Sequence, residues 1–137
     1  MGIDAGVCGV FGILLDERFE DLTDEMLDEA RTMIGAYETE FNVVYDVVED
    51  PDFSHRWLPV IVERARELGI EIPEEAYLEW SGDWEDRPAR CETPAECFLV
   101  GFGILLPPWE WQEKFGADKW SESFRKASRW HTWACMG

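Results

Sequence analysis

The sequence predicts an α+β fold: a single domain over residues 1–137, with a small mixed or antiparallel sheet covered by helices. Three observations predict it. The chain has 137 residues with eight Trp, eight Phe and three Tyr, which is enough apolar and aromatic surface for a folded core. Short apolar runs typical of buried strands alternate with segments of helical spacing. No Gly/Ser-rich linker divides the chain.

Two of the predicted strands share almost the same sequence. Gly9-Val-Phe-Gly-Ile-Leu-Leu15 recurs as Val100-Gly-Phe-Gly-Ile-Leu-Leu106. Glycine inside a strand marks a bulge or the close approach of another backbone. A duplicated half-domain would explain this echo, and so would convergence of two central strands on similar residues. Because the flanking segments do not align, we favour convergence.

A helix is predicted after the first of these strands, from about residue 24 to residue 36. Thr23 is a residue type suited to the N-cap, and Leu27 and Ala30 would lie on the buried face. Apolar residues then alternate with other residues over 41–48, and this period of two predicts another strand.

A second helix is predicted from Ser54, its expected N-cap, to Leu68. Pro59 moves the expected start towards Trp57, because proline is best tolerated in a first turn. Gly69 follows at the position where a left-handed backbone ends many helices.

The last third of the chain predicts shorter elements. Residues 73–80 are expected to form a short helix, and the second echo strand follows at 98–106. The pair Pro107-Pro108 interrupts the chain. A final helix is predicted over 118–130, with an aromatic and apolar stripe of Trp120, Phe124, Ala127 and Trp130.

Charge is distributed unevenly along the chain. Thirty acidic residues against twelve Lys and Arg give a net charge of −18. Residues 1–106 hold 26 acidic and 7 basic residues, a net of −19, whereas residues 107–137 hold 4 and 5, a net of +1. Direct binding of nucleic acid is not expected, because phosphates require a cationic surface.

No apolar run is long enough for a membrane span, and the N-terminus lacks the charge of a signal peptide, so we expect a cytoplasmic protein without a membrane partner.

The densest acidic run predicts a charged helix face. It contains eight carboxylates: Asp16, Glu17, Glu20, Asp21, Asp24, Glu25, Asp28 and Glu29. Residues three or four apart on a helix are neighbours about 5–6 Å apart at Cβ, which is comparable to the spacing of phosphates along a nucleic-acid strand. Such a row could dock in a basic groove. For a single helix the simpler interpretation is a solvated face, but here the acidity continues to Glu96 and then stops.

A second candidate binding surface combines aromatic and acidic residues. Trp80 and Trp84 could serve as interface anchors, with Asp83 and Glu85 pairing with arginines of a partner. The alternative is that both tryptophans fold back onto the core.

No motif in the sequence indicates a reaction, a metal or a cofactor. Gly101-Phe-Gly103 lacks the third glycine of a dinucleotide-binding signature. Cys8, Cys91, Cys97 and Cys135 match no strong zinc pattern, and in a reducing compartment we expect buried thiols rather than a disulfide framework, with a local Cys91–Cys97 bridge as the alternative. Thirty carboxylates make a useful pair unavoidable, so such pairs carry no information about catalysis.

These observations favour an acidic, non-enzymatic inhibitor of the anti-defence or immunity type. Its negative surface would block the nucleic-acid-binding surface of a basic protein target, such as a nucleic-acid-handling enzyme. The alternative is a small-ligand-binding protein or enzyme in a high-salt cytoplasm, where acidity serves solubility. Salt dependence separates the two hypotheses.

Overall fold

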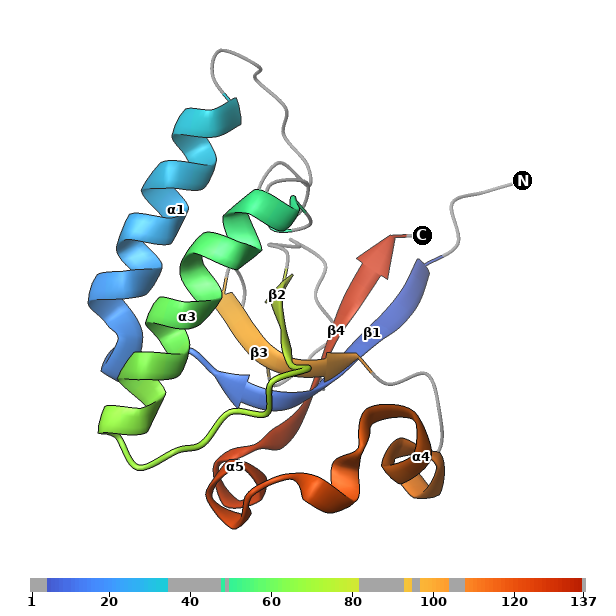
Figure 1. The fold of residues 1–137 in the computed structure, drawn as a ribbon. Helices are drawn as coiled ribbons and strands as arrows, with labels where there is room; N and C mark the ends of the chain where they lie inside the picture. Colours follow the sequence, from blue (N-terminus) through green and yellow to red (C-terminus); the bar gives the residue numbers. More distant parts are fainter. Residues whose placement is uncertain are drawn as a thin grey trace.

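Four antiparallel strands form one sheet in the order β2-β3-β1-β4 (Figure 1). They are β1 (Ala5–Leu14), β2 (Tyr77–Ser81), β3 (Cys97–Gly103) and β4 (Arg129–Met136). The structure is a computed structural model that describes residues 5–34, 48, 50–81, 93–94, 97–103 and 108–136. The predicted α+β class, with an antiparallel sheet, is confirmed.

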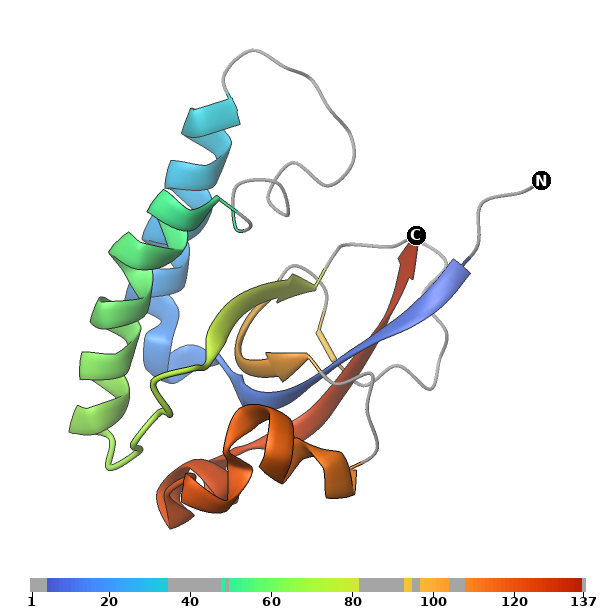
Figure 2. The ribbon, with the colours of Figure 1, turned by 45° about the vertical axis from the view of Figure 1, so that its right-hand side comes forward.

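The helices of the described residues form two groups. A short 3-10 turn, η1 (Glu17–Phe19), leads into α1 (Glu20–Ile34), which lies beside α3 (Pro51–Glu67) in both views (Figures 1 and 2). The second group precedes β4 and consists of η2 (Pro108–Glu110), α4 (Trp111–Phe115), η3 (Ala117–Lys119) and α5 (Glu122–Ala127).

Both groups of helices contribute to one core on a single face of the sheet. That face carries the alternate residues of three strands: Phe11 and Ile13, Leu78 and Trp80, and Phe98, Val100 and Phe102. Met26 of α1, Ile61 of α3 and Phe124 of α5 are completely buried in the same cluster. Phe102 stacks on Trp120 with ring centroids 4.5 Å apart. The core therefore joins both helical groups to the sheet.

The two echo strands, β1 and β3, are direct neighbours. Their antiparallel register places Phe11 opposite Phe102 and Gly12 opposite Gly101. A Cβ added to Gly12 would lie 2.7 Å from the Cα of Gly101, a distance that real Cβ atoms essentially never show. The close backbone approach predicted from the glycines is confirmed, and it requires the absence of a side chain at this pair.

Helix α1 begins earlier than predicted. Thr23 lies inside the helix, where its hydroxyl donates to the carbonyl of Glu20 at 3.1 Å. The N-cap of the preceding η1 turn is Asp16, whose carboxylate accepts from the Arg18 amide. The predicted Thr23 cap was wrong. A threonine side chain can cap a helix, but inside a helix its hydroxyl can also donate to a carbonyl of the preceding turn, as Thr23 does here.

Helix α3 also begins before its predicted cap. Asp50 is the N-cap and Pro51 occupies the first helical position, while the Ser54 hydroxyl donates to the carbonyl of Val48. Pro59 lies within the helix rather than at its start. The predicted end is confirmed, since Gly69 follows with a φ of 82°.

Two predicted helices were wrong in whole or in part. Within residues 73–80 the chain forms β2 instead, because Leu78 and Trp80 alternate into the core with the period of a strand. The predicted 118–130 helix contains only α5 with its flanking turns, and β4 begins at Arg129, where the chain pairs with β1. The strand predicted at 41–48 lies outside the described residues apart from Val48, which is buried.

Candidate functional site: the acidic face of helix α1

Helix α1 turns one face to the core and carries carboxylates on the opposite face. Leu22, Met26 and Ala30 are buried. The acidic face consists of five exposed carboxylates that make no ion pair among the described residues: Glu17, Glu20, Asp24, Glu25 and Asp28. With a rise of 1.5 Å per residue, the step from Glu20 to Asp28 covers about 12 Å of helix.

The other three carboxylates of the acidic run stabilise the fold. Asp16 caps η1 and accepts from Arg18 Nε at 2.9 Å, and this hydrogen bond lowers the pKa of Asp16. Glu29 is 15% exposed; it pairs with Arg56 and accepts a hydrogen bond from the Trp57 indole. The prediction that all eight carboxylates belong to one binding row needs correction for these residues, because their oxygens are engaged within the protein.

Asp21, the third of them, is held by Arg64 of α3. The guanidinium donates two hydrogen bonds to the Asp21 carboxylate, at 2.8 and 2.7 Å, and one to the Arg18 carbonyl at 2.9 Å. The hydrogen bonds from Arg64 lower the pKa of Asp21 from 3.8 to about 2. This bidentate contact fixes the start of α1 against α3. Sequence reasoning missed Arg64, since it lies 43 residues from Asp21 and no local signal joins them.

The remaining arginines of α3 are also paired. Arg56 contacts Glu29, and Arg66 contacts Glu63 at 2.7 Å and Glu71 at 3.8 Å. Each arginine of α3 is therefore paired with a carboxylate outside the acidic face, so the positive charges of α3 do not neutralise that face.

The predicted aromatic anchor Trp80 was wrong. Trp80 is 7% exposed and belongs to the main core, opposite Phe98 on β3. Trp80 lies in a strand with alternate burial rather than in the predicted short helix, and its side chain takes the alternative place on the core. Asp83, Trp84 and Glu85 lie outside the described residues.

The residues considered for metal binding or acid–base chemistry do not gather within the described part of the chain. The Cys97 thiol lies 2.9 Å from the Ser81 hydroxyl and 3.0 Å from the Pro94 carbonyl. His55 is exposed on α3, whereas His131 is half-buried on β4. Among the residues described, no three His, Cys, Asp or Glu side chains are placed to hold a metal ion.

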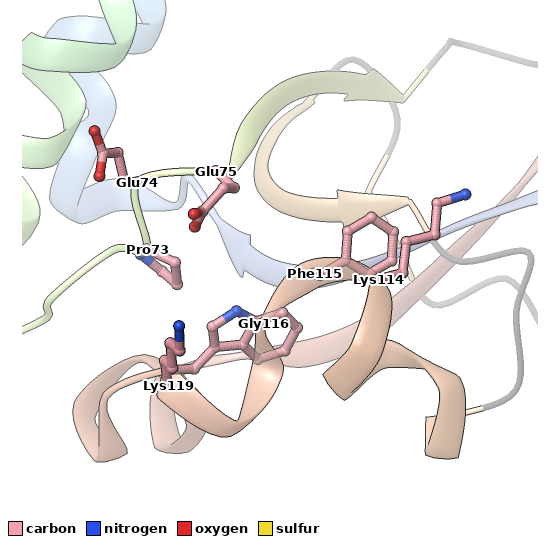
Figure 3. Close-up of a pocket in the computed structure, with 8 residues that line it drawn as sticks. Pro73, Glu74, Glu75, Lys114, Phe115, Gly116 and Lys119 are labelled. Carbon is pink, nitrogen blue, oxygen red and sulfur yellow. The ribbon is translucent and has the colours of Figure 1, made fainter.

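A small cleft separates the chain before β2 from the α4–η3 segment (Figure 3). It has a volume of about 280 Å³ and is lined by both signs of charge, with Glu74 and Glu75 on one side and Lys114 and Lys119 on the other. Its volume falls just below the range of about 300–1,000 Å³ that is usual for small-molecule sites. The mixed charge selects no particular ligand class.

No protein-family model, curated protein or solved structure matches this chain. Within the described residues, no helix combines the length and apolar character that crossing a membrane would require. The acidic face is therefore interpreted from its own geometry and charge.

Proposed function

We propose that the protein is an acidic inhibitor of the anti-defence or immunity type, like those made by phages and mobile elements. It binds a basic protein target, a nucleic-acid-binding enzyme or complex, and blocks the target's nucleic-acid-binding surface by charge mimicry. The observation that carries this proposal is the acidic face: five exposed carboxylates, four on α1 and one, Glu17, on the η1 turn that leads into it, without ion pairs among the described residues.

The arrangement of the acidic face suits the imitation of a phosphate strand. Neighbouring carboxylates on the helix lie about 5–6 Å apart at Cβ, on the scale of successive phosphates. The Arg64–Asp21 contact and the Glu29–Trp57 hydrogen bond hold α1 against α3, so the row is ordered before binding. A preorganised row loses less conformational entropy on association than a disordered acidic tail would.

The uneven charge supports the same proposal. A strongly negative field, which arises almost entirely from residues 1–106, attracts a cationic partner and speeds association. It also repels nucleic acid, so the protein competes for a basic groove without binding DNA or RNA itself. Such an inhibitor acts by occupancy in the cytoplasm of the target's cell and needs neither a catalytic residue nor a cofactor.

A charge-matched pair of variants tests the proposal. The first combines Glu20→Gln, Asp24→Asn and Asp28→Asn, all exposed on the acidic face and free of ion pairs among the described residues. The second combines Glu110→Gln, Glu113→Gln and Asp118→Asn, three exposed carboxylates near α4 and η3. Both remove three negative charges, and neither touches Asp21 or Glu29, which stabilise the fold.

Pull-down from the native host with identification by mass spectrometry provides the target. We expect wild type and the second variant to recover the same basic nucleic-acid-binding protein, and the first variant to bind it at least about tenfold more weakly. Titration against the purified target then measures displacement of its nucleic acid. Equal affinity of the two variants would remove α1 from the site, and a target that keeps its nucleic acid when saturated would refute charge mimicry.

A further inference from the structure

The cleft between the chain before β2 and the α4–η3 segment has opposite charges on its two walls (Figure 3). Glu74 and Glu75 lie on one wall, and Lys114 and Lys119 lie on the other. None of the four makes an ion pair among the described residues. Charge of both signs selects no ligand class by itself, so the selection depends on how the charges are arranged.

Glu75 and Lys119 are the charged side chains directed into this cleft. In Figure 3 the Glu75 carboxylate and the Lys119 ammonium group point towards the gap from opposite walls. The charged ends of Glu74 and Lys114 point away from it. A ligand that satisfies both inward charges therefore needs a negative group for Lys119 and a positive group for Glu75.

The indole of Trp120 adds a buried hydrogen-bond donor. Trp120 lines the cleft but is only 8% exposed, and its ring stacks on Phe102 with centroids 4.5 Å apart. The Nε1–H of this indole is buried and has no hydrogen-bond partner among the described residues. Such a donor has already lost its water, so an acceptor that reaches it gains the full hydrogen bond.

The uncharged lining of the cleft is mainly apolar. Pro73 and Phe115 join Trp120 there, and the Phe115 ring lies 5.2 Å from the Phe102 ring on which Trp120 stacks. Phe115 and Trp120 therefore pack on the same side of the sheet and offer one apolar surface to a ligand.

Hydrogen bonds tie the two walls of the cleft together. The Ser121 hydroxyl, directly after Trp120, donates to the Glu71 carbonyl at 2.9 Å. The Glu71 amide donates to the Ser123 hydroxyl, also at 2.9 Å. These contacts hold the chain before β2 against the start of α5, so the cleft is shaped before a ligand enters.

We propose that this cleft binds a zwitterion, a free α-amino acid with an apolar side chain. Lys119 holds the carboxylate, which also accepts the Trp120 indole hydrogen bond. Glu75 holds the ammonium group, and the side chain of the ligand lies against Phe115. The cleft volume of about 280 Å³ suits a ligand smaller than a drug-sized molecule.

The charge of the whole chain favours a zwitterion over a simple ion. A net charge of −18 repels an anion, and thirty carboxylates offer a simple cation many equivalent places. A zwitterion has no net charge and requires both signs at a fixed separation. The cleft and the acidic face share no residue, so this proposal stands independently of the proposed function.

The indole signal of Trp120 reports binding directly. Titration with leucine at physiological ionic strength is followed by NMR of the indole N–H groups, and Trp120→Phe and Trp109→Phe assign the two signals that matter. We expect leucine to move the Trp120 signal downfield and saturably, because its N–H gains an acceptor. The signal of Trp109, which is 78% exposed and does not line the cleft, should stay in place.

Three analogues of leucine test its three contacts. N-acetylleucine lacks the ammonium group, leucinamide lacks the carboxylate, and glycine keeps both charges but lacks the side chain. Each should bind at least about tenfold more weakly than leucine, since each loses a charge-assisted hydrogen bond or the apolar contact.

Charge-matched variants locate the site. Lys119→Gln should weaken leucine binding about tenfold. Lys126→Gln removes the same charge from an exposed position outside the cleft and should leave the affinity unchanged. Glu75→Gln is compared in the same way with Glu113→Gln, which is also exposed outside the cleft.

Four results would overturn the proposal. One is the absence of a saturable Trp120 shift with leucine. Another is N-acetylleucine or leucinamide binding as tightly as leucine, because one of the two charges would then take no part. Equal affinities of Lys119→Gln and Lys126→Gln would remove Lys119 from the site. The last is tighter binding by Lys119→Gln or Glu75→Gln, which would show that these charges close the cleft on each other instead of holding a ligand.

Discussion

The two adjacent helices α1 and α3 bury similar apolar stripes but use their charges differently. Met26 and Ala30 of α1 and Ile61 and Ala65 of α3 are completely buried in the same core. Arg56, Arg64 and Arg66 of α3 are all in ion pairs. Most carboxylates of α1 and its leading turn have no ion pair among the described residues.

This difference separates the charges that stabilise the fold from those that have no ion pair among the described residues. The carboxylates that contact α3, Asp21 and Glu29, connect the helices and cannot be separated from folding. The acidic face has no such constraint, and mutual repulsion along it opposes the compact state. A destabilising feature that packing does not require is the kind of feature that function retains.

The largest expected effect concerns the shared core. Ile61→Ala removes a completely buried side chain from α3 and should lower the free energy of unfolding by about 2–5 kcal/mol. The neighbouring Val60→Ala, at a position that is 42% exposed, should change it by less than about 0.5 kcal/mol. Urea denaturation followed by tryptophan fluorescence measures both. Similar losses in the two variants would contradict the described orientation of α3.

A smaller effect separates paired from unpaired carboxylates on the same helix. Asp21→Asn breaks the bidentate contact with Arg64, whereas Asp24→Asn removes a carboxylate that has no ion pair among the described residues and relieves repulsion. We expect Asp21→Asn to lower the midpoint of urea unfolding and Asp24→Asn to leave it unchanged or raise it. If both variants behaved alike, the Arg64 contact would contribute nothing specific to stability.

The pH dependence of that difference follows from the depressed pKa of Asp21. Its carboxyl has a pKa of about 2 in the folded protein against 3.8 ordinarily. The stabilisation from ionised Asp21 is therefore fully present above about pH 4 and is lost as the pH falls through about 2. The gap between wild type and Asp21→Asn should close over this window. A gap that persisted below pH 2 would have to arise from packing rather than from charge.

Local patterns predicted the parts of this fold that local interactions determine. The apolar stripe of α1 and the end of α3 at Gly69 follow from residues close together in the sequence. β4 was missed because Trp120 and Phe124 continue a helical spacing, while pairing with the distant β1 extends the chain from Arg129 onwards. Long-range pairing outweighs local propensity at such positions.

The candidate site was predicted only in outline for the same reason. The sequence located the acidic run, but it could not distinguish Asp21, which contacts Arg64, from Asp24, which has no ion pair among the described residues. It left open whether Trp80 is an exposed anchor or part of the core, and pairing with the adjacent strand β3 brings that side chain into the core. Which charges are free depends on partners about thirty to forty residues away, and no spacing in the sequence encodes those contacts.

The smallest expected effect is the response of stability to salt, and it tests why the acidic face exists. At 0.01 M salt the screening length is about 30 Å, and at 0.15 M it is about 8 Å. The protein should already be folded at 0.01 M because its core and ion pairs are sufficient, and thermal denaturation should show a gain of a few degrees by 0.15 M as repulsion is screened. The variant Glu20→Gln, Asp24→Asn, Asp28→Asn should show a smaller gain, since it lacks three of the five charges on the acidic face.

Loss of structure at low salt with recovery only in molar salt would favour the alternative of a protein adapted to a high-salt cytoplasm. In that case the acidity would serve solubility, and the comparison between α1 and α3 would concern the solvent rather than a partner.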